Sequence, residues 1–159
     1  MDQRGFSRWL KAVIVGVGIC GGIIYFYVIP TWGKDLVSMY PEFGNRYFPW
    51  LVILWITGIP CYAVLVLGWR IARQIGLDNS FSEINARDLK YVAWMAILDA
   101  TFFFAANVVM LLMNMSHPAV MIGSLLVIFA GIAVAVVAAT GSHLIQKAAK
   151  LKEENDLTI

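Results

Sequence analysis

The chain has 159 residues, of which 60% are apolar and 14% are charged. Average proteins carry about 45–50% apolar and 25% charged residues, so this composition excludes an ordinary soluble domain, and its hydrophobicity excludes a disordered chain. The formal charge of +2 is too small for a protein that binds nucleic acid directly through a phosphate-neutralising surface. The composition is typical of an integral membrane protein with a single domain.

Long stretches without Asp, Glu, Lys or Arg define the predicted membrane spans. Two of them, Ala12–Ile29 and Tyr47–Trp69, each suit one helix, since a hydrocarbon core needs about 20 helical residues. The third, Tyr91–Gln146, is too long for one helix and contains a polar cluster, Asn114–Pro118, that predicts a turn. The sequence therefore predicts four spans, at about 11–29, 48–69, 91–113 and 119–145.

The first span follows a basic segment, as the apolar region of a secretory signal does. Its apolar stretch is long, however, and it leads to Pro30 without a small-residue cleavage site. We expect a retained helix that ends near Ile29, followed by an outer loop from Pro30 to Phe48.

Lysine and arginine residues predict the orientation of the spans. Ten of them lie in the N-terminal segment, in the loop 70–90 and in the tail 146–159, whereas only Lys34 and Arg46 lie in the other loops. Cytosolic segments of membrane proteins are enriched in these residues. We therefore expect an all-α, antiparallel four-helix transmembrane bundle in a bacterial cytoplasmic membrane, with both termini in the cytosol.

Small residues recur at helical spacing in two of the spans. The segment Gly16–Gly21 matches G-x-G-x-x-G, but this motif binds a dinucleotide only between a strand and a helix, so it indicates no cofactor here. Gly18 and Gly22 instead form a G-x-x-x-G pair, which allows helix backbones to approach closely. A similar stripe on the fourth span consists of Gly131, Ala135 and Ala139. Packing within one bundle and self-association into a homo-oligomer both remain open for these stripes, with the first favoured.

Asp99 is the one acidic residue within a predicted span. Ionisable residues inside a membrane are costly and often mark function. Tyr62 lies at a similar depth on the second span and Asn107 follows on the third, so a polar strip facing the bundle interior is expected. Two interpretations of Asp99 remain open. It is a proton or ligand site in this strip, or it is a hydrogen-bonded carboxyl that holds helices together, and the second interpretation is favoured.

No pattern in the sequence indicates an enzyme or a metal site. Cys20 and Cys61 lie near mid-membrane without the electropositive setting of a reactive thiol. His117 lies in the outer turn and His143 lies near the inner end of the fourth span, so the two are at opposite membrane faces and cannot share a metal. We expect a non-enzymatic protein without metal or cofactor.

The segment before the third span contains a helix-start signal. Ser80 and Glu83 fit the capping box S-x-x-E, which predicts a helix that begins around Phe81. Its first turns would then expose Arg87, Asp88 and Lys90.

This entry segment, Asn79–Asn85, together with the ending Glu153–Ile159, resembles the YoaS-like family of small four-helix bacterial membrane proteins of unknown function. The resemblance covers essentially the whole chain. It implies pairing with a small cytosolic helix-turn-helix regulator of the Cro/C1 type, and it implies no catalytic residue.

The leading hypothesis is a sensory or regulatory membrane protein whose cytosolic loop and tail bind such a regulator. The docking candidates are Ser80, Phe81, Glu83, Asn85, Glu154, Asn155, Asp156 and Leu157. The alternatives are a small transporter or channel-like subunit that uses Asp99, and a self-protection protein against membrane-active peptides.

Overall fold

The structure is a computed structural model that describes residues 3–116 and 118–156, and this part of the chain forms helices and no strand. The elements are α1 (Gln3–Ile23), a π-helical turn η1 (Ile24–Val28), α2 (Ile29–Met39), a 3₁₀ turn η2 (Pro41–Phe43), α3 (Gly44–Gly76), α4 (Glu83–Leu112) and α5 (Pro118–Asp156). Four helical segments are long and apolar enough to cross a membrane, which confirms the predicted all-helical, four-span architecture. Those segments are Gln3–Met39, Gly44–Gly76, Glu83–Leu112 and Val120–Asn155.

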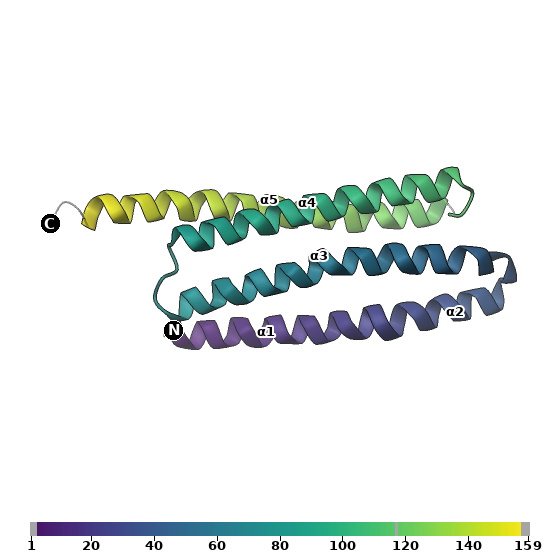
Figure 1. The fold of residues 1–159 in the computed structure, drawn as a ribbon, viewed down its shortest axis with the longest axis horizontal. Helices are drawn as coiled ribbons and strands as arrows, with labels where there is room; N and C mark the ends of the chain where they lie inside the picture. The colour runs from purple at the N-terminus through teal and green to yellow at the C-terminus, as the bar shows by residue number, and fades with distance from the viewer. Residues whose placement is uncertain (1–2, 117, 157–159) are drawn as a thin grey trace.

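The helices run antiparallel and pack in the order α1, α3, α4, α5 (Figure 1). The most extensive interface joins α4 to α5, while α3 joins this hairpin to α1. The start of α1, the connection 77–82 and the end of α5 lie at the same end of the molecule, which we call the basic end. The connections 40–43 and 113–116 lie at the opposite end, which we call the hairpin end.

Small side chains allow α4 and α5 to approach closely. Ala93 and Ala100 on α4 are buried, as are Ala135 and Ala138 on α5. A Cβ built at Gly131 would lie 3.5 Å from the Cβ of Ala100, which is ordinary van der Waals contact. Such a close interface is a usual solution in a membrane, where packing rather than hydrophobic burial holds helices together.

The first helix extends beyond its predicted end. The sequence predicts a loop from Pro30 to Phe48, whereas α2 continues the rod through Pro30 to Met39. The π-helical turn explains this continuation, because it widens the backbone just before Pro30, which has no N–H to donate. The prediction of a long outer loop was wrong for this reason.

The segment predicted as the loop 70–90 is also largely helical. α3 continues to Gly76 and α4 begins at Glu83, so the connection spans only residues 77–82. Two hydrogen bonds close the end of α3, from Asn79 N–H to the Gln74 carbonyl (3.0 Å) and from Asp78 N–H to the Ile75 carbonyl (3.1 Å). This is a Schellman motif, and Asp78 adopts its left-handed position with φ 60°.

The turn between α4 and α5 also begins with a Schellman motif. Met115 N–H donates to the Met110 carbonyl at 2.8 Å, and Asn114 adopts the left-handed conformation with φ 53°. Asparagine tolerates this conformation better than most residues. The turn therefore lies within the predicted Asn114–Pro118 cluster.

Candidate functional site

Asp99 lies in a cavity between α3, α4 and α5, at the level of the π-helical turn. The cavity measures about 380 Å³. The Cys61 Sγ lies 4.0 Å from Asp99 Oδ2, and the Tyr25 hydroxyl lies 3.5 Å from Thr57 Oγ1 within the same lining. No Lys or Arg is among the described residues that line it. A lone carboxyl with hydroxyl neighbours can hold a proton or accept a cation.

The other two members of the expected polar strip lie elsewhere. Tyr62 faces α1, where its hydroxyl donates to the Gly18 carbonyl at 2.8 Å. Asn107 is fully buried on α4 and donates to the Phe103 carbonyl of its own helix at 2.8 Å. Neither residue lines the Asp99 cavity, so the expectation of a single strip is wrong. Adjacent helix positions differ by about 100°, which is why Cys61 reaches Asp99 and Tyr62 does not.

Tyr25 and Thr57 line the same cavity as Asp99 and were not predicted from the sequence. Tyr25 belongs to the π-helical turn, whose position cannot be read from hydropathy. Thr57 also donates to the Leu54 carbonyl of its own helix, which is the ordinary role of a threonine in a span.

The G-x-x-x-G pair of α1 lies against α3. A Cβ built at Gly22 would lie 3.2 Å from the Tyr62 hydroxyl, and one at Gly18 would lie 3.6 Å from Leu65. Both glycines thus make room for side chains of the same bundle. On α5, Gly131 and Ala135 face α4, but the next buried position is Ala138, and Ala139 is exposed. The positions of α5 that face α4 are therefore 131, 135 and 138, spaced four and then three residues apart as in supercoiled helix pairs. They do not keep the constant spacing of four residues that the predicted stripe has.

The basic end contains a buried ion pair. Asp88 is 1% exposed, and its Oδ2 lies 3.2 Å from Nε of Arg70, whose side chain is half-exposed. The attraction is electrostatic, because neither carboxylate oxygen has a partner with hydrogen-bond geometry among the described residues. The prediction that Asp88 lies on exposed turns of the helix was therefore wrong. The spacing Asn85, Asp88, Val92 follows the helical period and could have assigned it to the buried face.

The connection 77–82 is held by Asn85. Its amide nitrogen donates to the carbonyls of Asn79 (3.2 Å) and Ser80 (2.9 Å). The residue that caps α4 is Ser82, whose hydroxyl accepts from Asn85 N–H at 3.3 Å. The predicted Ser80–Glu83 capping box was therefore wrong, and the predicted start at Phe81 lies two residues before Glu83, the first helical residue.

The docking candidates differ in accessibility. Phe81 is 59% exposed and Glu83 is exposed, whereas Asn85 is fully buried and cannot touch a partner. Glu154 and Asn155 are exposed on the last turns of α5, which ends at Asp156. Leu157 lies outside the described residues.

The last part of α5 extends past the bundle. The hydroxyl of Ser142 donates to the Ala86 carbonyl at 2.6 Å, which sets the register of the two helices near the start of α4. From that level α5 continues to Asp156 and passes the first residue of α4 by about 15 Å at 1.5 Å per residue. Figure 1 shows this overhang beyond the N-terminus and the connection 77–82.

Within residues 3–116 and 118–156, no three His, Cys, Asp or Glu side chains are grouped so that they could hold a metal ion. Both cysteines are free thiols.

Comparison with known proteins supports the resemblance noted from the sequence. The family model described as "Protein of unknown function (DUF2975)" matches residues 31–159. The uncharacterized membrane protein YoaS of Bacillus subtilis (strain 168) is 28% identical over 159 residues, which covers 99% of each chain. No solved structure matches the chain.

Proposed function

The chain belongs to the DUF2975 family of proteins of unknown function, and we propose that it is a non-enzymatic regulatory protein of a bacterial cytoplasmic membrane. In this proposal its basic end lies in the cytosol and binds a small helix-turn-helix transcription regulator. The observation that carries the proposal is the overhang of α5, which extends past its partner helix beside the well-anchored connection 77–82.

The side chains of this end suit a protein partner. Leu77 and Phe81 are exposed on the connection although they are apolar, and Leu151 is exposed on the overhang. Exposed apolar groups outside the bilayer commonly mark interaction sites. Because Asn85 fixes the connection, Phe81 would meet a partner without a large ordering cost.

The orientation is supported by charge. Ten of the twelve lysine and arginine residues lie in segments at the basic end, and such residues favour the cytosolic side. The class of partner comes from the family resemblance.

The test is affinity capture from solubilised membranes with a tag on the N-terminus, followed by mass spectrometry. We expect recovery of a small DNA-binding protein with the full chain. Phe81→Ala and a chain that stops after Lys152 should each fail to recover the DNA-binding protein. Met39→Ala, which shortens an exposed apolar side chain at the hairpin end, should still recover it. Capture that is indifferent to both changes, or that yields no DNA-binding protein, would contradict the proposal.

A second candidate function is transport of a proton or small cation, and the Asp99 cavity favours it. In proteoliposomes, Asp99→Asn should then abolish flux that the parent protein supports. Thr101→Ala is the matched control, because within the described residues the Thr101 hydroxyl bonds only to the Ile97 carbonyl of its own helix, at 2.7 Å. Absence of flux in the parent protein would exclude this candidate.

A further inference from the structure

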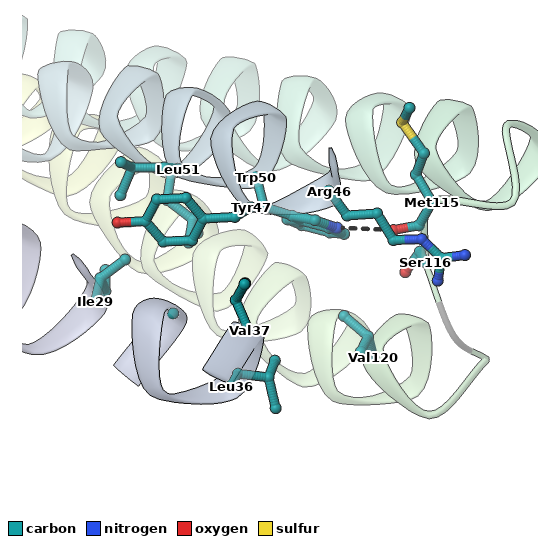
Figure 2. Close-up of a pocket in the computed structure, with 12 residues that line it drawn as sticks. Ile29, Leu36, Val37, Arg46, Tyr47, Trp50, Leu51, Met115, Ser116 and Val120 are labelled. Carbon is teal, nitrogen blue, oxygen red and sulfur yellow. Dashed lines mark hydrogen bonds between the residues drawn. The ribbon is translucent and has the colours of Figure 1, made fainter. Parts of the chain in front are cut away.

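A pocket of about 260 Å³ opens at the hairpin end, far from the proposed partner surface (Figure 2). Three segments enclose it: α2, the first part of α3, and the turn between α4 and α5 with the beginning of α5. Most of its wall is aliphatic, formed by Ile29, Leu36, Val37, Leu51, Leu54 and Val120. Such a wall matches a hydrocarbon ligand.

Specific contacts hold the walls of the pocket in place. The indole N–H of Trp50 donates to the Met115 carbonyl at 3.2 Å and so joins α3 to the Schellman turn. The Tyr47 hydroxyl donates to the Pro30 carbonyl at 3.4 Å. The Tyr47 ring lies directly on Gly33, where an added Cβ would be only 2.5 Å from the ring. The pocket is therefore a formed site rather than a loose gap between helices.

Polar groups are confined to one part of the lining. Arg46 is the one charged side chain among the lining residues. The Ser116 hydroxyl is buried and has no hydrogen-bond partner within the described chain. Arg46 and Ser116 both line the pocket, and Figure 2 draws both on the side where Met115 lies. A guanidinium and a hydroxyl donor in one pocket lining suit phosphate oxygens, which accept charge-assisted hydrogen bonds.

We propose that this pocket binds an anionic phospholipid, with one acyl chain against the aliphatic wall and the phosphate at Arg46 and Ser116. The geometry along α3 fits this ligand: Leu54 is eight residues, or about 12 Å, deeper than Arg46. Tyr47 and Trp50 lie between the two, and aromatic residues of this kind favour the membrane–water interface. A soluble anion would leave the apolar wall without a counterpart. This inference does not depend on the regulator partner.

The test is titration of the full-length protein in detergent with phosphatidylglycerol and phosphatidylcholine of identical chains, monitored by native mass spectrometry. We expect one phosphatidylglycerol to bind with at least tenfold higher affinity, roughly the worth of one charge-assisted hydrogen bond. Arg46→Gln should remove this preference. Val37→Phe should lower the affinity for both lipids, because Val37 points into the space beside Trp50 (Figure 2).

Matched controls separate the pocket from general effects of charge and size. Lys34→Gln removes the same charge at the same end without altering the lining, and Val137→Phe adds the same ring on an exposed face of α5. Both should bind like the parent. Equal affinity for the two lipids, retained preference in Arg46→Gln, or displacement of phosphatidylglycerol by inorganic phosphate alone would overturn the proposal. A lipid-free dimer that blocks binding would assign the pocket to a second copy and would also overturn it.

Discussion

The indole N–H of Trp55 donates to the main-chain carbonyl of Tyr25 at 3.1 Å and so joins α3 to the π-helical turn. This bond supplies a donor that the first helix lacks. Within the turn, the Ile29 N–H is directed to the Ile24 carbonyl, and Pro30 has no N–H. Tyr25 therefore loses its regular helical donors in a region without water, and a neighbouring helix compensates, as membrane proteins require at proline.

We expect Trp55→Phe to lower the free energy of unfolding by about 1 kcal/mol, the usual worth of such a bond within a membrane. The loss should be smaller in a Pro30→Ala background, because alanine at position 30 restores a donor close to the Tyr25 carbonyl. Unfolding in mixed micelles measures the loss that Trp55→Phe causes in the parent protein and in the Pro30→Ala background. Trp32→Phe is the control, since the Trp32 indole is exposed and has no hydrogen bond to the described residues. Equal losses in the two backgrounds would disprove the compensation.

The buried ion pair at the basic end predicts an asymmetry between two variants. Arg70→Gln leaves the buried Asp88 carboxylate without its cation and should cost about 2 kcal/mol, less than for a fully buried pair because Arg70 is half-exposed. Asp88→Asn removes the buried charge itself and should cost less. Combining both changes should recover part of the loss. Thermal unfolding measures these differences, and Arg73→Gln, an exposed arginine one turn away, should be neutral. A larger cost for Asp88→Asn would contradict this assignment.

The start of α4 distinguishes the observed cap from the one expected from sequence. Ser82→Ala removes the acceptor for Asn85 N–H and should destabilise the protein by about 1 kcal/mol, as loss of an N-cap commonly does. Ser80→Ala should be nearly neutral, because only the main-chain carbonyl of Ser80 bonds to Asn85. Hydrogen exchange of the amides of Glu83–Asn85 should rise in the first variant only. The reverse result would restore the Ser80–Glu83 capping box.

Adjacent alanines on α5 test the register of its interface. Ala138→Leu inserts volume where the side chain is 5% exposed and should cost 1–3 kcal/mol or separate the helices, as overpacking does. Ala139→Leu adds the same volume at an exposed position and should have little effect on unfolding. Equal costs would show that the two helices meet in another register.

Hydropathy and charge were enough to predict the four spans and the all-helical class, because a bilayer requires about 20 apolar residues for each crossing whatever their neighbours. They also predicted the turn near Asn114. Helix ends were less well predicted: Pro30 was read as a stop, and only the π-helical turn with Trp55 shows how the helix continues through it.

The tertiary structure decided which side chains meet. Apolar residues cover nearly every face of a membrane-spanning helix, so the sequence could not predict that Cys61 faces Asp99 while Tyr62 faces Gly18. It could not predict that Arg70 is the partner of Asp88, because that contact depends on α3 extending as a helix beyond its predicted span and on how α3 packs against α4. The sequence by itself determined how many apolar stretches are long enough to cross a bilayer, because that number depends on local composition. The rotation of each helix about its axis, and hence every candidate site, was determined by close packing between segments distant in the chain.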